Sequence, residues 1–272
     1  MTYDPSGLFT GAAPFYARYR PGYPAALFTT LSERFGLDGT QQVLDLGCGT
    51  GQIALRLAPL VAHVHAVDPD HQMLHEGAKL ATAAGINNIS WRDGDSYHLD
   101  DLDLPELDLV TMGASFHWTD RPALLADLDR RLTPTGAVVL ASGGPPATAI
   151  ELPWVDVVTQ VRTAHLGPQR RAGDTTYTHP RLTHTEVLAT SAFSDIDITT
   201  WHWDSHRDID SVIGLQFSFS YSAPGQFSDE SARAAFEHDL RAALVDRFGP
   251  DAVLTEHLTT ELIIATRPNG GS

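Results

Sequence analysis

The sequence predicts an α/β protein whose central sheet is parallel and doubly wound. Up to Ser142, five short apolar runs typical of strands alternate with helix-like stretches, and such alternation indicates a parallel sheet covered by helices on both faces. A glycine-rich turn joins the first of these strands to the helix that follows it. Acidic or polar residues follow the carboxyl ends of successive strands, which is where open α/β sheets bind their ligands.

The expected elements follow one another with short connections. Each strand is expected from a run of apolar or β-branched residues, and each helix from apolar residues at helical spacing. The expected strands are residues 43–46, 63–67, 88–91, 107–112 and 137–142. The expected helices are residues 13–20, 25–35, 52–60, 71–84 and 122–132, with Asp70 as the N-cap of the fourth.

The alternation stops after the fifth strand. Residues 143–192 hold one amphipathic stretch and a polar run rich in Arg, His and Thr, a composition that indicates a cap. Strands are expected again at residues 196–203 and 257–266, and helices at 210–220 and 229–248. The sequence thus predicts four segments: an N-terminal lid and helix (1–36), a cofactor-binding core (37–142), a cap insertion (143–192) and a C-terminal part of the core fold (193–272).

Length, charge and cysteine content narrow the functional class. The 272 residues suffice for one large domain with an additional lobe. A formal net charge of −16 disfavours nucleic acid and anionic membranes as partners, and we expect neither. With Cys48 as the single cysteine no internal disulfide can form. The first ten residues are polar and unlike a signal peptide, and no apolar run is long enough to cross a membrane, so a cytoplasmic enzyme is expected, and a homo-oligomer is left open.

The glycine-rich turn at residues 47–51 indicates a nucleotide-like ligand. Glycines there let a ligand lie against bare backbone, close to the N–H groups at the start of a helix. Nicotinamide or flavin dinucleotide enzymes and S-adenosylmethionine enzymes both use such a turn. The spacing here is G-x-G-x-G, with Gln52 where the dinucleotide fingerprint has Gly or Ala. Asp45 would repel a pyrophosphate and suits a ligand with a cationic amino group.

A carboxylate also follows the second strand. Asp68 stands at its tip, where a ribose is held through its two hydroxyls. Because a dinucleotide and S-adenosylmethionine both contain this ribose, Asp68 does not discriminate between them.

The run Asp45-Leu46-Gly47-Cys48-Gly49-Thr50-Gly51 resembles the first motif of the class I S-adenosylmethionine-dependent methyltransferases. Three further features follow at successive strand ends in the order of that family: Asp68, then Asp95-Ser96, then the run from Ser115 to Trp118. The N-terminal run Phe15-x-x-x-Tyr19-Arg20-Pro21-Gly22-Tyr23-Pro24 is similar to that of many bacterial small-molecule methyltransferases. The resemblance implies a Rossmann-like seven-stranded sheet, mostly parallel with an antiparallel last strand, and S-adenosylmethionine as cofactor.

The resemblance also implies cofactor contacts. Tyr16 and Arg20 would approach the methionine carboxylate, Met73 would cover one adenine face, and Asp95 would accept a hydrogen bond from the adenine amino group. The expected cofactor-binding residues are Tyr16, Arg20, Asp45, Gly47, Cys48, Gly49, Gly51, Gln52, Asp68, Pro69, Met73, Asp95, Ser96, Ala114 and Ser115. Met73 can equally be a core residue, and the N-terminal aromatics can equally pack on the domain edge.

The acceptor side is less defined. His117, just past the fourth strand, is the candidate catalytic base because imidazole titrates near neutral pH; alternatively it only orients the following helix. The expected substrate-binding residues are Tyr19, Phe116, Trp118, His165 and Tyr177. His165, Tyr177 and His179 can equally be surface residues. No metal is assigned, since the histidines around His179 lack ligand spacing.

Three functions remain open. The sequence favours an S-adenosylmethionine-dependent methyltransferase acting on a small hydrophobic or aromatic acceptor, such as an intermediate of secondary metabolism, because aromatic residues are frequent in the expected lid and cap. The alternatives are a nicotinamide-dependent oxidoreductase of the same fold class and a non-catalytic S-adenosylmethionine-binding protein. The sequence does not distinguish methylation of oxygen, nitrogen or carbon.

Overall fold

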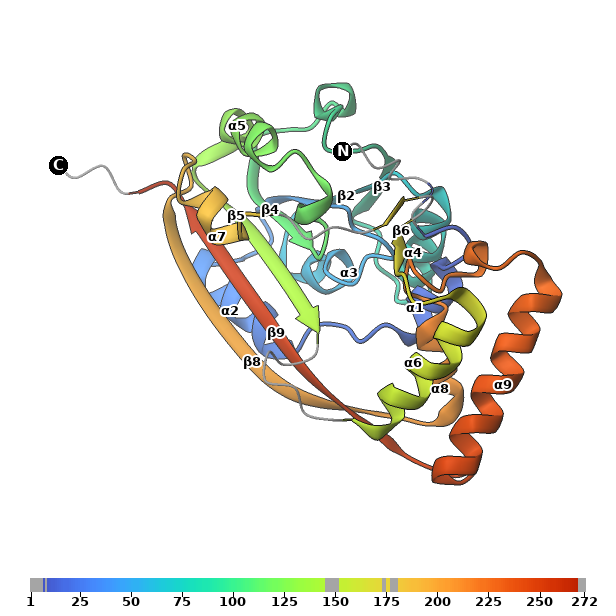
Figure 1. The fold of residues 1–272 in the computed structure, drawn as a ribbon. Helices are drawn as coiled ribbons and strands as arrows, with labels where there is room; N and C mark the ends of the chain where they lie inside the picture. Colours follow the sequence, from blue (N-terminus) through green and yellow to red (C-terminus); the bar gives the residue numbers. More distant parts are fainter. Residues whose placement is uncertain (1–6, 8, 145–151, 173–174, 177–180, 269–272) are drawn as a thin grey trace. The chain divides into compact units, whose positions relative to one another are not determined.

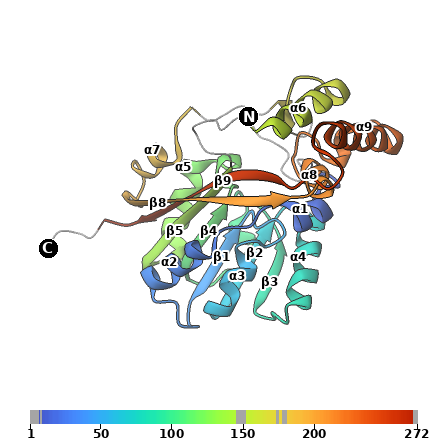
Figure 2. The same cartoon turned by 90° about the horizontal axis from the view of Figure 1, so that it is seen from below.

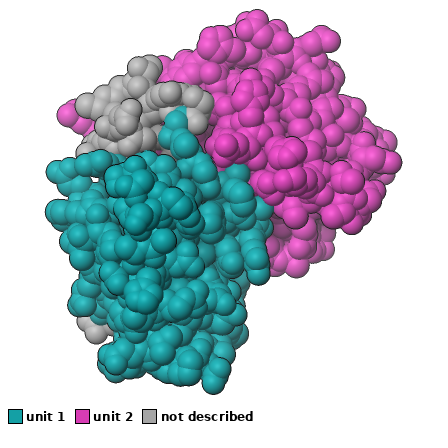
Figure 3. Space-filling model, turned by 90° about the vertical axis from the view of Figure 1, so that its right-hand side faces the viewer, with its two compact units in different colours: residues 1–21, 144–178, 202–259 teal, residues 22–143, 179–201, 260–272 magenta. Residues whose placement is uncertain are grey.

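The computed structural model describes residue 7 and residues 9–144, 152–172, 175–176 and 181–268 (Figure 1). The chain forms two compact units (Figure 3). Unit 1 comprises residues 1–21, 144–178 and 202–259, and unit 2 comprises residues 22–143, 179–201 and 260–272. The four segments expected from the sequence stay a prediction about domains. In the structure, residues 202–259, which that division assigns to the core fold, belong to unit 1.

One seven-stranded sheet runs through the fold in the order β3-β2-β1-β4-β5-β9-β8. The strands are β1 (Gln42–Leu46), β2 (His63–Asp68), β3 (Ile89–Asp93), β4 (Leu107–Gly113), β5 (Leu132–Gly144), β8 (Asp195–Arg207) and β9 (Leu254–Thr266). The first five pair in parallel, and Figure 2 shows them side by side with α4 (His71–Ala83) flanking β3. The strand order reverses between β1 and β4, and open α/β sheets bind their ligands at the carboxyl ends of the strands beside such a reversal.

The last two strands run antiparallel. His202 pairs with Thr259, Asp204 with His257 and His206 with Thr255, so partner numbers fall on β9 as they rise on β8. Figure 1 shows the arrow of β9 opposed to that of β5. The prediction of a seven-stranded, mostly parallel sheet with an antiparallel last strand is therefore confirmed, with β9 as that strand, although β8 and β9 are each longer than the sequence indicated.

Both faces of the sheet in unit 2 are apolar, as a doubly wound sheet requires. On β1, Val43 belongs to one buried cluster and its neighbour Leu44 to another, because successive side chains of a strand point to opposite faces. The first cluster includes residues of α2 (Ala25–Phe35) and α3 (Ala54–Leu57). The second includes residues of α5 (Arg121–Arg131) and α7 (His184–Leu188). Each helix thus covers one defined face.

Local sequence explains where these helices begin and end. The Asp70 carboxylate accepts hydrogen bonds from the backbone N–H groups of Gln72 and Met73, so the predicted N-cap of α4 is confirmed. The predicted helix over residues 52–60 is wrong in extent. The chain is a turn up to Ile53, α3 covers four residues, and a 3-10 turn, η2 (Ala58–Leu60), follows because Pro59 cannot donate the next helical hydrogen bond. Two further 3-10 turns are η3 (Leu99–Leu102) and η4 (Phe116–Trp118).

Unit 1 is mainly helical. Its elements are α1 (Ala13–Tyr19), α6 (Pro153–Leu166), the short strands β6 (Arg171–Ala172) and β7 (Thr175–Thr176), α8 (Ile209–Gln216), the 3-10 turn η5 (Pro224–Gln226) and α9 (Glu230–Phe248). Helices α6 and α9 lie side by side (Figure 1). Trp154, Phe217 and Phe236 form the centre of its core. The predicted helix over 210–220 ends earlier, at Gln216. No helix in the described segments combines the length and apolarity of a membrane span.

Candidate functional site

The glycine turn after β1 is a tight structure held by its neighbours. Gly47, Gly49 and Gly51 have φ values of 69°, 54° and 80°, a region that residues with a side chain rarely adopt. The N–H groups of Gly47 and Cys48 donate to the Val67 carbonyl oxygen at 2.8 and 3.0 Å, which ties the turn to the end of β2. A Cβ on Gly47 would lie 2.4 Å from the Cβ of Ser115. The backbone there is therefore specific to glycine.

Trp91 of β3 packs beneath this turn. A Cβ on Gly51 or on Gly77 of α4 would come within 2.4 Å of the Trp91 ring, so the indole occupies the space that two missing side chains leave. The three residues come from the turn, a helix and a strand. Their packing positions the turn relative to β3.

Asp68, at the end of β2, is buried beside the turn. Its carboxylate accepts hydrogen bonds from the N–H of Gly49 at 2.8 Å and the N–H of Asp70 at 2.9 Å. Burial raises the pKa of Asp68 to about 6, against the effect of these two hydrogen bonds. The side chain that the sequence predicted to hold a ribose is thus fixed at the turn by backbone donors.

Asp45 is a second buried carboxylate at the same place, only 1% exposed. It accepts hydrogen bonds from the Thr111 hydroxyl at 2.8 Å and from the Ala54 N–H at 3.1 Å. Burial raises its pKa to about 7, and the nearby charge of Asp68 acts in the same direction. Among the described residues, neither carboxylate has a Lys, Arg or His partner. The site therefore combines two buried acids, and no cationic side chain in the described part of the chain balances them.

Two polar groups beside these acids are also buried. The Thr50 hydroxyl, in the turn itself, has no hydrogen-bond partner among the described residues, and such an orphan is uncommon in a folded protein. The Cys48 thiol donates to the Gly49 carbonyl at 3.5 Å, and burial raises its pKa. An unpaired hydroxyl and two uncompensated carboxylates suit a ligand that brings a cation and hydrogen-bonding groups.

The other residues expected to bind the cofactor take varied positions in unit 2. Asp95 follows β3, and its Oδ1 accepts hydrogen bonds from the Tyr97 N–H at 2.8 Å and His98 Nδ1 at 2.9 Å. These bonds fix the Asp95 side chain in its own turn. Met73 is buried at 2% exposure, in the first turn of α4. The three residues Pro69, Gln52 and Ser96 are half-buried. Their contact with a ligand stays a prediction.

The end of β4 is strained. Ala114 has a φ of 53°, which costs free energy for a residue with a Cβ, and its N–H donates to the Ala141 carbonyl at 2.8 Å. The Ser115 hydroxyl donates to the Leu46 carbonyl at 2.7 Å. Ser115 was expected at the cofactor, and in the structure this hydrogen bond joins the ends of β1 and β4. Strain at this position is typical of ligand-binding turns.

His117 lies in η4, directly after this turn, with a partner that sequence reasoning missed. Its ring is stacked on that of His184 at 6.3 Å between centroids and 20° between planes, and it touches Trp118 at 4.7 Å. His184 also packs edge-on against Phe116, which is buried. His184 begins α7, far away along the chain, so no local pattern could pair it with His117.

The environment of His184 keeps it neutral. Its Nδ1 accepts from Arg121 at 3.4 Å, and the same guanidinium donates to the carbonyls of Leu182 and Thr183. Burial and then the charge of Arg121 lower the pKa of His184. A neutral imidazole can accept a proton, so the His117–His184 pair forms a candidate acid–base group at the end of β4.

Tyr23 is a further site residue that was not among those expected. A Cβ on Gly113 would lie 2.7 Å from the Tyr23 hydroxyl oxygen and 2.9 Å from Cδ1 of Ile53. The hydroxyl of Tyr23 therefore lies against the backbone at the carboxyl end of β4. The aromatic composition of the N-terminal segment, and its place in the family-like run from Phe15 to Pro24, were the signals that could have indicated it.

The remaining expected residues belong to unit 1. Tyr19 packs on Gly214 of α8, where a Cβ would lie 2.2 Å from its ring. Arg20 donates to the Ser218 carbonyl at 3.1 Å, and its guanidinium lies 5.0 Å from the Tyr16 ring centroid. His165 Nε2 is hydrogen-bonded to the Asp239 carboxylate at 2.9 Å. Tyr177 lies outside the described residues. For these residues the roles expected at cofactor and substrate stay predictions.

The comparisons agree with this geometry. Residues 43–136 match the family model described as a methyltransferase domain. A relative named uncharacterized methyltransferase C25B8.09, from Schizosaccharomyces pombe, is 29% identical over 147 residues, covering 54% of this chain and 55% of the relative. The malonyl-[acyl-carrier protein] O-methyltransferase of Bacillus cereus is 27% identical over 146 residues, covering 50% and 51%. The chain thus spans about half the length of the curated relatives that it matches.

Solved structures agree on the fold. A S-adenosylmethionine-dependent methyltransferase from Thiobacillus denitrificans, solved with S-adenosyl-L-homocysteine, superposes with a TM-score of 0.50 at 16% identity, covering 96% of this chain and 98% of that one. The matched family segment contains the glycine turn, Asp68, Asp95 and His117, in the order that the sequence predicted. Residues 43–136 therefore match a methyltransferase domain, and the chain shares the fold of S-adenosylmethionine-dependent methyltransferases of known structure.

Proposed function

We propose that this protein transfers the methyl group of S-adenosylmethionine to a small, hydrophobic or aromatic acceptor. The observation that supports the cofactor most directly is the pair of buried carboxylates, Asp45 and Asp68, beside a glycine turn and without a cationic partner among the described residues. Burying uncompensated carboxylates is costly, and a ligand with positive charge would offset that cost.

The charge of the ligand distinguishes the two cofactor classes. S-adenosylmethionine has an ammonium and a sulfonium group, and both are attracted by carboxylates. The pyrophosphate of a nicotinamide dinucleotide is an anion, which the same carboxylates would repel. Asp68 would accept hydrogen bonds from the ribose hydroxyls, as it accepts now from Gly49 and Asp70. The Thr50 hydroxyl is available to a polar group of the ligand.

The residues of the chain would position the acceptor and move its proton. When bound, S-adenosylmethionine supplies an electrophilic methyl group on a sulfonium that is already a good leaving group. His117 would take the proton from a hydroxyl acceptor, with His184 stacked on it as an adjacent neutral imidazole. Phe116 and Trp118 flank His117 in η4. Trp118 would bind the acceptor near this base, whereas Phe116 is buried in the core and would support the turn from below. Collinear placement of acceptor and methyl group is the main requirement for the rate.

The charge of the chain and one named relative indicate the class of acceptor. The formal charge of −16 disfavours nucleic acid as substrate, and the single cysteine is consistent with a reducing cytoplasm. One relative is named for O-methylation of a malonyl group on an acyl-carrier protein, which favours oxygen as the accepting atom. We propose a natural-product intermediate with a hydroxyl or carboxyl group as the acceptor.

Titration calorimetry tests the cofactor assignment. The protein is titrated separately with S-adenosylmethionine, S-adenosylhomocysteine and NADH. We expect binding of the first two and none of NADH; the reverse result would make the oxidoreductase the better assignment. Transfer of a labelled methyl group to a panel of phenols and aromatic acids then separates an enzyme from a protein that only binds the cofactor.

A pair of histidine variants tests the proposed base. His117→Gln should lower kcat about 10²-fold or more while leaving cofactor affinity unchanged. His75→Gln is the matched control, because His75 is exposed on α4. Equal kcat values in the two variants would assign His117 to orienting α5 only.

A further inference from the structure

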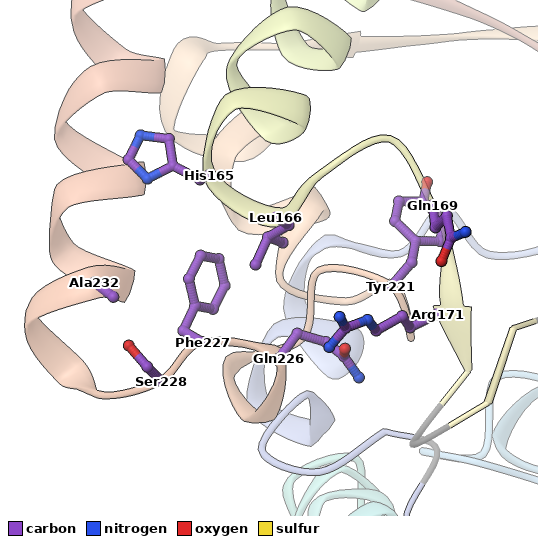
Figure 4. A pocket seen from close by; sticks show the side chains of 9 residues that line it. All are labelled: His165, Leu166, Gln169, Arg171, Tyr221, Gln226, Phe227, Ser228 and Ala232. Carbon is purple, nitrogen blue, oxygen red and sulfur yellow. The ribbon is translucent and has the colours of Figure 1, made fainter.

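Unit 1 contains a pocket of its own. Its volume is about 260 Å³, and its lining comes from the end of α6, the loop into β6, and the segment from Tyr221 to the first turn of α9. In the view of Figure 4, Arg171, Gln226 and Tyr221 lie on one side of the pocket, His165, Ser228 and Ala232 lie on the other, and Phe227 lies between them. The first side is rich in hydrogen-bond donors.

Three arginines gather on the Tyr221 side. The guanidinium of Arg170 lies 4.8 Å from the centroid of the Tyr221 ring, and that of Arg162 lies 5.9 Å from it. Arg171 lines the pocket itself. Arg162 is 5% exposed, and among the described residues its guanidinium donates to the Gly167 carbonyl and the Thr163 hydroxyl. Arg171 thus lines the pocket, and two further guanidinium groups lie over the ring of Tyr221, another residue of the lining.

These arginines have no acidic partner within the described residues. The arginine ion pairs of unit 1 join Arg207 to Glu256, Arg233 to Glu230 and Glu237, and Arg241 to Asp210 and Glu237. The chain has 34 acidic and 18 basic side chains, so partners are abundant elsewhere. Burial lowers the pKa of Arg162, and the like charge of Arg170 lowers it further. An anion in the pocket would relieve this repulsion.

Tyr221 adds a neutral donor to the cluster. Its ring is stacked on Phe219 at 5.1 Å and 10°, and the guanidinium of Arg20 lies 4.1 Å from the Phe219 centroid. Burial raises the pKa of Tyr221, while Arg170, Arg20 and Arg162 act in the opposite direction. The phenol therefore keeps its proton at neutral pH and can donate it in a hydrogen bond. Cations near the ring strengthen an O–H donor.

Two acidic side chains near the pocket already have hydrogen-bond partners, and both belong to α9 or its N-cap. The Asp239 carboxylate pairs with His165 at 2.9 Å. The Asp229 carboxylate caps α9 by accepting from the Ala232 N–H at 2.9 Å. Next to the side of the pocket that holds Arg171 and Tyr221, Leu166 and Phe227 form an apolar surface. The pocket therefore has one cationic side and an apolar middle, so a complementary ligand has an oxyanion group and an apolar body.

We propose that the pocket of unit 1 binds a small organic anion, whose carboxylate or phosphate group accepts hydrogen bonds from Arg171 and Tyr221 and whose apolar part packs on Phe227 and Leu166. This binding does not depend on the proposed methyl transfer.

Binding of benzoate, phenyl phosphate and benzamide, measured by calorimetry without cofactor, tests the proposal. Benzamide is the neutral analogue of benzoate and has nearly the same shape. We expect the anions to bind at least tenfold more tightly than benzamide, because charge-assisted hydrogen bonds to arginine are lost with the charge. Tighter binding of benzoate would indicate a carboxylate ligand, and tighter binding of phenyl phosphate a phosphate ligand. Equal binding of anions and amide, or no binding of either anion, would overturn the proposal.

Variants locate the binding. Arg171→Gln should lower the affinity for the preferred anion about tenfold or more, and Tyr221→Phe should lower that affinity several-fold. Arg247→Gln is the matched control, because Arg247 is an exposed arginine of unit 1 that lies against Phe248, away from the pocket lining. It should bind like the parent protein. Anion binding that is unaffected by Arg171→Gln would place the site elsewhere.

Two further measurements distinguish a loss of anion binding from a loss of folding and from a failure of the proposed function. Arg171 is exposed, so Arg171→Gln should melt at the temperature of the parent protein. If Arg171→Gln melts at a lower temperature, the second test is the effect of added NaCl on the parent protein. The salt should weaken anion binding, because it screens the charges. Binding of S-adenosylmethionine is measured in parallel. If none is detected, that result would count against the proposed function without affecting the anion result.

Discussion

The carboxylate of Asp68 accepts a hydrogen bond from the N–H of Gly49 at 2.8 Å. This bond joins Asp68, the last residue of β2, to Gly49, in the middle of the turn that follows β1. It also places a carboxylate at the turn before any ligand binds. The first two predictions test Asp68 and another glycine of the same turn, Gly47.

Replacing Asp68 should weaken binding of the cofactor. Asp68→Ala removes a charge-assisted contact of roughly 1.5–3 kcal/mol to the ribose hydroxyls, which corresponds to about a ten- to hundred-fold loss of S-adenosylmethionine affinity by calorimetry. Asp93→Asn is the control, since Asp93 ends the neighbouring strand but is exposed and pairs with His71. A loss below threefold for Asp68→Ala would mean that another acid holds the ribose.

Replacing Gly47 should destabilise unit 2. Gly47→Ala places a Cβ 2.4 Å from that of Ser115, at a φ of 69°. Gly36→Ala has a similar φ of 57° with nothing within 4 Å, so it measures the backbone strain alone, about 1–2 kcal/mol. Thermal melts should show a clearly larger loss for Gly47→Ala, together with loss of cofactor binding. Equal losses would show that Ser115 moves aside freely.

Stability and cofactor affinity should change with pH in opposite directions. The pKa values of Asp45 and Asp68 are raised in the folded state to about 7 and about 6, from 3.8 in the unfolded chain. Between about pH 4 and pH 7 the folded state therefore binds more protons, so the free energy of unfolding falls as pH rises and then levels off. The slope is at most about 1.4 kcal/mol per pH unit for each group.

A cationic ligand prefers the ionised carboxylates, so S-adenosylmethionine should bind more tightly at pH 7.5 than at pH 5.5, with proton release near pH 6. Asp45→Asn should flatten both curves, because the amide can still accept from the Ala54 N–H while carrying no charge. Chemical denaturation and calorimetry across this range provide the measurement. Unchanged slopes in Asp45→Asn would contradict the assignment to this residue.

The N-terminal segment should be protected differently when cofactor binds, if it acts as a lid. Within unit 1 the segment is anchored by Tyr19 on Gly214, by Arg20 on the Ser218 carbonyl, and by the Gly225 N–H donating to Thr10 at 3.1 Å. We expect hydrogen exchange in residues 9–23 to slow when S-adenosylhomocysteine is added. Equal protection in both states would identify the segment as a fixed strap of unit 1.

The sequence by itself determined the α/β class, the positions of β1 to β5 and the glycine turn. These depend on local properties: apolar runs, an Asp at a helix N-cap, and glycines where φ is positive. The family resemblance extended them to seven strands and to the ordered acids Asp45, Asp68 and Asp95. Short-range chemistry is enough for such features, because the residues involved are neighbours along the chain.

Only the tertiary structure decided which distant residues meet. The stacking of His184 on His117, the packing of Trp91 beneath Gly51 and Gly77, and the grouping of Arg162, Arg170 and Arg171 around Tyr221 each join different elements. The raised pKa values of Asp45 and Asp68 also arise from burial, which exists only once the sheet and its helices have packed. Contacts and desolvation depend on the whole fold, whereas propensity and capping depend on a few consecutive residues.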